Sequence, residues 1–287
     1  MNSTLSQLKK YKIRPKKRFS QNFLLDEDML ESIINLYDLQ EDEIVVEIGA
    51  GLGALTERLA PRVKRVIALE IDTTLVHLLK DKIIRHSNVD IVNKDVLQFD
   101  FSGIAKEYGG RFKVLGNIPY SISAPLIFKL SEYKDFLSIA VLLLQKEVAD
   151  RIVASPGTKA YGVLSVFSQV DASVSMDLTI PRQCFYPQPK VDSALVRFQF
   201  LKTLHLDIED IAIFKKLVRA SFAQRRKILK NTLKNSLSLN ISFEEILQAV
   251  ILCGIDPGRR GETLSLEEFK NLSNTLSKYQ SHSVISG

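Results

Sequence analysis

The sequence contains few cysteines and no long apolar run, and each shortage excludes a class of protein. Only two of the 287 residues are cysteines, Cys184 and Cys253, which is too few for a disulfide-stabilised scaffold or a zinc site built from cysteines. The longest strongly apolar run, Ile139 to Leu144, is far shorter than the ~18–20 residues that cross a bilayer. We therefore expect neither a metal site nor a membrane-spanning segment.

Acidic residues are missing from the start of the chain. Residues 1–18 carry seven basic residues and no acid. Because no apolar stretch follows them, we do not expect a secretory signal, whereas a mitochondrial presequence, which is also basic and free of acids, stays open. Together with the free cysteines, the lack of a secretory signal favours the cytoplasm.

The net charge of +6 is distributed unevenly along the chain. Residues 201–287 carry thirteen basic and nine acidic residues, so residues 19–200 have a net charge of −5. Basic ends on a mildly acidic body point to a polyanionic partner that the ends contact. The alternative is a solvated tail and one basic surface helix.

The order of apolar segments predicts the fold. The chain is 45% hydrophobic and 25% charged, as in packed globular proteins, and its length suits one large domain or about two ordinary ones. Helix-like stretches such as 73–85 lie between apolar, strand-like runs, which predicts a mostly parallel α/β sheet covered on both faces. These runs begin 22 to 25 residues apart, at Ile44, Val66, Val89, Lys113 and Ser138.

The remaining segments predict an edge hairpin and a helical domain. The runs 174–180 and 193–200 are separated by a proline-rich loop and are expected to close the sheet as a hairpin. Residues 211–234 are helix-like, with eight basic residues and no acid. Two capping boxes follow, Ser242 with Glu245 and Ser265 with Glu268. We therefore expect a basic arm at 1–18, an α/β domain at 19–203 and an all-helical domain at 204–287.

A glycine-rich loop follows the first predicted strand, in the sequence Glu47-Ile48-Gly49-Ala50-Gly51-Leu52-Gly53-Ala54. Glycines allow a sharp turn and a close approach of a ligand to the backbone. Gly49, Gly51 and Ala54 fit the dinucleotide-binding fingerprint in its G/A form. The alternative is a tight strand-to-helix turn without a ligand.

Two carboxylates follow at the ends of the next strands. Glu70 closes the second strand and Asp95 follows the third. Glu70 could accept hydrogen bonds from both hydroxyls of a ribose, in a nicotinamide dinucleotide or in S-adenosylmethionine. Asp95 could accept a hydrogen bond from an adenine amino group. Alternatively, both are solvent-exposed carboxylates at strand ends.

The fourth strand runs into Asn117-Ile118-Pro119-Tyr120. The amino group of adenine is a poor nucleophile, because its lone pair is delocalised into the ring. The Asn117 side-chain carbonyl and a backbone carbonyl at the proline could hold its two N–H groups and favour a pyramidal nitrogen. Tyr120 offers a flat face for base stacking, worth about 1–3 kcal/mol. The alternative is an ordinary turn at the end of a strand.

The segment 117–120 resembles the catalytic N-[LI]-P-Y motif of the ribosomal RNA adenine N6-dimethyltransferases, which use S-adenosylmethionine. Four other segments resemble this family in the same order, and the similarity extends from about residue 14 to 275: Phe19-Ser20-Gln21-Asn22-Phe23-Leu24, the glycine loop, Gln145-Lys146-Glu147-Val148-Ala149, and Phe185-Tyr186-Pro187-Gln188-Pro189-Lys190-Val191-Asp192-Ser193. The resemblance implies a Rossmann-like class I methyltransferase sheet with a small C-terminal helical domain.

The resemblance also implies roles for individual residues. Asn117, Pro119 and Tyr120 would hold the target adenine, and Phe185 would stack on the flipped base from the other side. The cofactor S-adenosylmethionine would be contacted by Asn22, Leu24, Gly49, Gly51, Glu70, Asp95 and Asn117.

Three branches of the family share these motifs: small-subunit enzymes, large-subunit enzymes of the macrolide-resistance type, and mitochondrial relatives. Ile118 is typical of the resistance branch. The segments 221–231 and 256–262 resemble the helical domain of the small-subunit enzymes. There Arg225, Arg226, Lys227 and Lys230 offer charges for RNA phosphates.

The implied activity is therefore the dimethylation of two adjacent adenosines near the 3′ end of small-subunit ribosomal RNA, in the free RNA or in a pre-30S particle, by a monomer that serves ribosome biogenesis. The alternatives are a large-subunit adenine N6-methyltransferase, a non-catalytic ribosome-assembly factor and, more distantly, a dehydrogenase.

Overall fold

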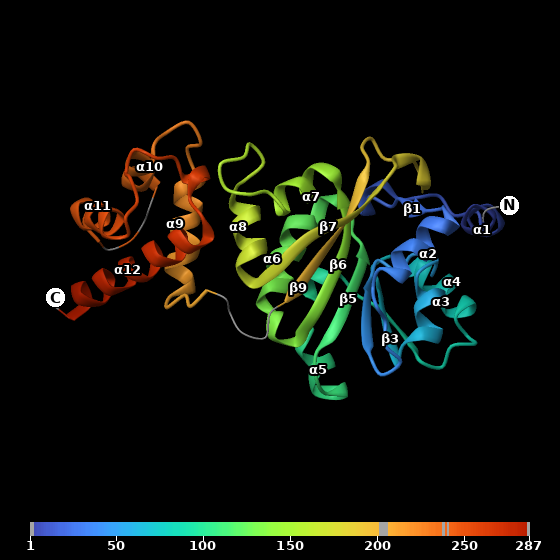
Figure 1. The fold of residues 1–287 in the computed structure, drawn as a ribbon. Helices are drawn as coiled ribbons and strands as arrows, with labels where there is room; N and C mark the ends of the chain where they lie inside the picture. Colours follow the sequence, from blue (N-terminus) through green and yellow to red (C-terminus); the bar gives the residue numbers. More distant parts are fainter. Residues whose placement is uncertain (1–2, 201–205, 237–238, 240, 286–287) are drawn as a thin grey trace. The chain divides into compact units, whose positions relative to one another are not determined.

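The computed structural model describes residues 3–200, 206–236, 239 and 241–285 (Figure 1). The chain forms two compact units. The first contains Met1–Asp150 and Ala172–Lys202, and the second contains Arg151–Asp171 and Thr203–Gly287. The segment 151–171 thus belongs to the second unit, together with the C-terminal helices. The domain boundary expected between 203 and 204 lies outside the described residues.

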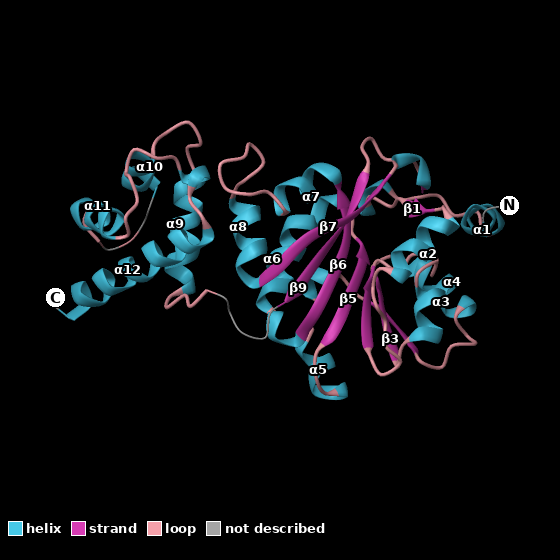
Figure 2. Ribbon diagram, viewed as in Figure 1, coloured by secondary structure: helices cyan, strands magenta, loops and turns pink. Residues whose placement is uncertain are grey.

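A seven-stranded sheet forms the first unit, in the order β4-β3-β2-β5-β6-β9-β7 (Figure 2). The strands β4, β3, β2, β5 and β6 are parallel, whereas β9 is antiparallel to both β6 and the edge strand β7. The strand bounds are β2 Ile44–Ile48, β3 Arg65–Glu70, β4 Val89–Asn93, β5 Phe112–Asn117, β6 Leu137–Gln145, β7 Ala172–Ile180 and β9 Ser193–Phe200. The expected α/β sheet and its closing hairpin are confirmed.

Helices flank this sheet (Figure 2). Every residue of β2 is buried, and because successive side chains of a strand point to opposite faces, both faces of β2 must be covered. The helices of the first unit are α1 Ser3–Lys10, α2 Glu27–Asn35, α3 Thr56–Leu59, α4 Thr73–Lys82, α5 Ser102–Tyr108 and α6 Ser123–Glu132, and α7 Lys146–Ile152 leads into the second unit. A two-stranded ribbon, β1 Phe23–Leu24 with β8 Phe185–Tyr186, is separate from the sheet.

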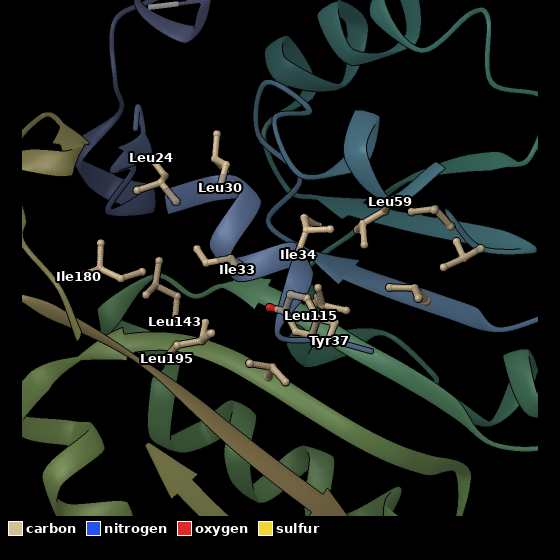
Figure 3. Packing of buried hydrophobic residues seen from close by; sticks show 14 of the residues in the cluster. Leu24, Leu30, Ile33, Ile34, Tyr37, Leu59, Leu115, Leu143, Ile180 and Leu195 are labelled. Carbon is tan, nitrogen blue, oxygen red and sulfur yellow. The ribbon is translucent and has the colours of Figure 1, made fainter. Parts of the chain in front are cut away.

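Helix α2 shows how local sequence produces the packing. Asp26 caps its first turn by accepting a hydrogen bond from the Met29 amide. Leu30, Ile33 and Ile34 share one helical face and are almost completely buried. Figure 3 shows this face among side chains from the sheet, including Leu115 and Leu143. Each such side chain stabilises the fold by about 1.5–3 kcal/mol through burial.

The strand order places a crevice at one edge of the sheet. Strand β2 pairs with β3 on one side and with β5 on the other. The connections after β2 and after β4 therefore lead to opposite sides of β2. In open parallel sheets, ligands bind at the carboxyl ends of the strands where the order reverses in this way.

The second unit is helical and contains the two predicted capping boxes. Its helices are α8 Val163–Asp171, α9 Ile211–Phe222, α10 Leu229–Ser236, α11 Phe243–Leu252 and α12 Leu266–Ile285. The capping boxes of α11 and α12 are confirmed: Ser242 and Glu245 bond reciprocally, as do Ser265 and Glu268.

The segment 211–234 is not one continuous helix, because turns separate α9 from α10. The segment 256–262 packs against the chain at this break. Gly261 packs so closely on the end of α9 that an added Cβ would lie 2.4 Å from the Ser221 carbonyl oxygen. The Leu229 amide then donates to the Arg259 carbonyl oxygen at 2.6 Å, which fixes the start of α10. Among the described helices of both units, none is long and apolar enough to cross a membrane.

Candidate active site

A cleft of about 280 Å³ lies at the carboxyl ends of β2, β3, β4 and β5 in the first unit. Its lining combines the segment 18–23, the glycine loop, the ends of β3 and β4, and the segment 117–122. Eight of the residues expected in the site meet there: Asn22, Gly49, Gly51, Glu70, Asp95, Asn117, Pro119 and Tyr120.

The glycine loop requires its glycines for conformation and for space. Gly49, Gly51 and Gly53 have φ angles of +75°, +58° and +75°, in the left-handed region that other residues rarely adopt. A Cβ at Gly53 would lie 2.5 Å from the Cδ1 atom of Leu79, so helix α4 packs directly against the loop. Lys82 of α4 also donates to the Leu52 carbonyl oxygen at 2.8 Å. The loop is therefore held rigidly where a ligand can approach its backbone.

Glu70 is a buried carboxylate held by backbone donors. Its Oε2 atom accepts from the Gly51 amide and its Oε1 atom from the Asp72 amide, both at 2.8 Å. Burial raises the pKa of Glu70 above its ordinary value, although these hydrogen bonds act in the opposite direction. Each oxygen keeps a second lone pair. Glu70 can therefore accept two further hydrogen bonds, as a vicinal diol would provide.

Asp95 caps the short 3-10 turn that follows β4. Its Oδ1 atom accepts from the Leu97 amide at 2.9 Å. Within the described part of the chain, its Oδ2 atom has no hydrogen-bond donor. That oxygen can accept a hydrogen bond from an amino group of a ligand in the cleft.

Asn117 is oriented by a hydrogen bond from its side-chain amide. Its Nδ2 atom donates to the Asn22 carbonyl oxygen at 3.0 Å. This hydrogen bond uses the amide nitrogen and leaves the Oδ1 atom without a donor among the described residues. The site therefore presents a free side-chain acceptor at the end of β5.

Tyr120 is fixed by a hydrogen bond to the end of β9. Its hydroxyl lies 2.9 Å from the Oγ atom of Ser193, a residue with no exposed surface. Burial raises the pKa of Tyr120 above its ordinary value. The ring is thus anchored through its hydroxyl, while the residue lines the cleft.

The segment before Asn22 is attached to helix α4 by a buried carboxylate. Asp72, the N-cap of α4, accepts from Lys16 Nζ at 2.6 Å and from Gln21 Nε2 at 2.9 Å. The Lys16 amide donates in turn to the Gln21 side chain at 2.8 Å. These bonds hold the backbone around residue 22 beside the glycine loop.

Two residues expected in the site do not line the cleft. Leu24 and Phe185 are 6% and 3% exposed and lie in the main core cluster. They face each other across the ribbon of β1 and β8. Because side chains alternate along a strand, the neighbour of Phe185 points away from the core. That neighbour, Tyr186, is 44% exposed.

The cleft also contains residues that no motif singled out by itself. Ile71 follows Glu70 directly, lines the cleft and is 41% exposed. A large apolar side chain that remains exposed beside a carboxylate provides a surface for a flat ring. Ile71 could have been predicted from the sequence, because it directly follows the acidic residue that ends a strand.

The basic residues of the second unit are not equivalent. Arg225 pairs with Glu262 at 2.9 Å and also donates to the Lys159 carbonyl oxygen. Within the described ranges, Arg226, Lys227 and Lys230 are exposed and have no carboxylate partner. Arg225 therefore connects segments of its own unit, whereas the other three cations are available to bind an anion.

Comparison with protein families identifies one model over nearly the whole chain. Residues 13–278 match the model described as ribosomal RNA adenine dimethylase. The chain is 45% identical over 265 residues to the ribosomal RNA small subunit methyltransferase A of Geobacter metallireducens, covering 92% of this chain and 96% of the relative. It is 44% identical over 279 residues to the protein of the same name from Bacillus mycoides, covering 96% of each.

Solved structures agree with this match. A dimethyladenosine transferase from Plasmodium falciparum superposes with a TM-score of 0.77 at 26% identity, covering 88% of this chain and 97% of the other. The 23S rRNA methyltransferase ErmE superposes with a TM-score of 0.67 at 25% identity, covering 89% and 99%.

Proposed function

The chain belongs to the ribosomal RNA adenine dimethylase family, and from that premise we propose that it dimethylates N6 of two adjacent adenosines near the 3′ end of small-subunit ribosomal RNA. S-adenosylmethionine is the methyl donor. The product, N6,N6-dimethyladenosine, serves the biogenesis of the small subunit. The observation that carries this proposal is the free Oδ1 acceptor of Asn117, which shares one cleft with Glu70 and Asp95.

The residues of the cleft fit S-adenosylmethionine. Glu70 can accept from the two ribose hydroxyls, Ile71 can lie against the adenine ring, and Asp95 Oδ2 can accept from the adenine amino group. The left-handed glycines, which have no side chains, would let the methionine end approach the backbone. When bound, S-adenosylmethionine supplies a methyl group on a positively charged sulfur.

The protein's main contribution to catalysis is to position the target nitrogen. Asn117 Oδ1 accepts one N–H of the adenine amino group. Pro119 contributes its carbonyl oxygen, which accepts from the Ile122 amide at 3.0 Å and keeps a second lone pair for the other N–H. Two acceptors hold the nitrogen with its lone pair directed at the methyl group, and such alignment alone can contribute about 7–11 kcal/mol.

A flipped base must be stabilised outside its stack, which costs a few kcal/mol. Tyr120 offers a fixed aromatic face for it, worth about 1–3 kcal/mol. No strong general base is required, because the N6 proton becomes acidic once the nitrogen is alkylated. The Asn117 side-chain carbonyl accepts a hydrogen bond from that N–H, and the proton passes to solvent water once the nitrogen has been alkylated.

RNA binding is assigned to the second unit. Arg226, Lys227 and Lys230 extend from the turns after α9 and from the start of α10, where they can contact phosphates. Arg225 supports the same segment through Glu262. We place this reaction in the cytoplasm, by a monomer acting on small-subunit RNA or on a pre-30S particle.

The proposal is tested by supplying labelled S-adenosylmethionine with purified small-subunit and large-subunit particles and mapping methylated adenosines by mass spectrometry. We expect two adjacent dimethyladenosines near the 3′ end of the small-subunit RNA. Ile118, which is typical of the resistance branch, favours the large-subunit alternative. Label confined to large-subunit RNA would support that alternative and overturn the proposal.

A further inference from the structure

The N-terminal basic segment is folded onto the first unit. Helix α1 spans Ser3–Lys10, and its Leu8 side chain is only 4% exposed. Leu8 packs in a cluster with Phe23, Leu52 and Leu75. After the helix the chain turns back, with the Ile13 amide bonded to the Leu8 carbonyl oxygen at 2.9 Å. Figure 1 shows α1 next to β1. The segment therefore has a defined position.

This packing leaves the cations of the segment on the surface. Lys9, Lys10, Lys12, Arg14 and Arg18 are exposed, and no described carboxylate lies within ion-pair distance of any of them. Lys16 instead forms an ion pair with Asp72 at 2.6 Å. Unpaired like charges on one folded element repel one another, and an anionic partner would relieve that repulsion.

Aromatic rings are interleaved with these cations. Lys10 Nζ lies 5.0 Å from the centre of the Tyr11 ring, and the Arg18 guanidinium lies 4.5 Å from that of Phe19. Tyr11 is 45% exposed. Cations that follow a backbone and aromatic faces that accept bases are the two components of single-stranded nucleic-acid binding.

The segment is attached directly to the walls of the cleft. Phe23 and Leu75, which pack against Leu8, both line the cleft, and so does Arg18. Lys16 and Gln21 fix the intervening chain to Asp72 at the start of α4. A phosphate bound by these cations would thus be held at a set distance from the target base.

We propose that the exposed cations Lys9, Lys10, Lys12, Arg14 and Arg18 form a phosphate-binding surface on the first unit that holds the RNA strand carrying the target adenosine. This inference rests on the proposed function and extends it. It assigns an RNA-binding role to the unit that contains the cleft, separate from the basic residues of the second unit. The N-terminal segment is then part of the substrate-binding machinery.

The test uses a triple variant, Lys9→Gln, Lys10→Gln and Lys12→Gln, which retains Leu5, Leu8 and Ile13 and so preserves the packing of α1. A matched control removes three exposed charges of the same unit by Lys64→Gln, Arg85→Gln and Lys106→Gln. Lys64 and Arg85 precede β3 and β4, and Lys106 precedes β5, so all three lie toward the amino ends of the strands, away from the cleft.

Binding of a small-subunit RNA fragment is measured against salt concentration, with S-adenosylmethionine affinity as a second readout. Each lost phosphate contact lowers the slope of log K against log salt by about 0.7–0.9. We expect the N-terminal variant to bind RNA roughly tenfold or more weakly, with a slope smaller by about 2–3. Its affinity for S-adenosylmethionine should stay unchanged, and the control should bind like the wild type.

Equal losses in the two triple variants would show an effect of net charge alone and overturn the inference, as would unchanged RNA binding in the N-terminal variant. The proposed function is judged separately, by whether the wild-type protein methylates the RNA. If the wild-type protein binds this RNA without methylating it, the proposed function is refuted. The comparison of RNA binding between the variants and the wild type still decides the role of the N-terminal segment.

Discussion

At the scale of single residues, the proposed activity centres on the side-chain amide of Asn117, whose nitrogen is hydrogen-bonded. Asn117 donates from its Nδ2 atom to the Asn22 carbonyl oxygen, and its Oδ1 atom has no donor among the described residues. We expect Asn117→Ala to lower the rate of methyl transfer by on the order of a hundredfold or more, because the amino group loses an acceptor that aligns it. Single-turnover assays measure this rate, and filter binding should show RNA affinity close to that of the wild type. Retained turnover would contradict the role of Asn117.

The hydrogen bond between Tyr120 and Ser193 predicts coupled mutant effects. Ser193→Ala and Tyr120→Phe each remove one partner and keep the aromatic ring. We expect each to lower kcat several-fold, consistent with about 0.5–1.5 kcal/mol for such a bond, with little change in KM. The double variant should be no worse than either single variant. Additive losses, or losses that follow the melting temperature alone, would show that the bond does not position the ring.

Glu47 predicts a pH dependence of stability. This fully buried carboxyl accepts a hydrogen bond from Thr56 Oγ1 at 2.5 Å, and burial raises its pKa from 4.5 to about 8. Between these values the folded state holds a proton that the unfolded state has released. The stability contributed by the neutral acid is therefore complete below pH 4.5 and is lost as the pH rises toward 8, by at most about 1.4 kcal/mol per pH unit.

Glu47→Gln has no proton to lose and should flatten this dependence between pH 5 and pH 8. Urea unfolding at several pH values measures it, with the wild type as the reference. The same slope in both proteins would show that Glu47 is ionised in the folded state.

At the scale of elements, the strands could be predicted because their apolar runs recur at regular spacing, with turn residues between them. The location of the cleft could be predicted from the polar residues Glu70, Asp95 and Asn117, which lie at or just after the ends of three strands. Because these strands are parallel, their carboxyl ends meet at one edge of the sheet. The burial of Phe185 could not be predicted. Phe185 and Tyr186 are adjacent aromatics, and only the pairing with β1 decides which of them faces the core.

The break between α9 and α10 was equally hidden from the sequence. The residues of 211–234 favour helix, and at the interruption they contact the distant segment 256–262. The same distant segment supplies Glu262, which binds Arg225. Local sequence therefore could not distinguish Arg225, which is paired within its own unit, from the neighbouring cations that have no described carboxylate partner.

That separation leads to a prediction for the turns after α9. Arg226→Glu combined with Lys227→Glu should weaken RNA binding and leave the melting temperature and S-adenosylmethionine affinity unchanged, because neither cation has a described carboxylate partner. Arg225→Gln should instead lower the stability modestly, by up to about 1 kcal/mol, since its ion pair is half-exposed. Calorimetry and filter binding separate the two effects. Equal melting temperatures for Arg225→Gln and the wild type would contradict the supporting role.

At the scale of the whole molecule, the chain combines a unit that carries the cleft with a helical unit that carries free cations. The sequence predicted both kinds of structure, but it did not predict that segment 151–171 belongs to the helical unit. That segment contributes Tyr161 and Phe167, whose rings contact Phe222 and Phe214 of α9. Long-range aromatic packing of this kind has no local signature.

The central claim is that one cleft at the carboxyl ends of the strands receives both the methyl donor and the target purine. A crystal structure with S-adenosylhomocysteine tests it most directly. The account predicts ribose hydroxyls bonded to Glu70, the adenine amino group at Asp95 Oδ2, and the Asn117 carbonyl still free. An empty cleft, or a ligand whose ribose lies away from Glu70, would contradict it.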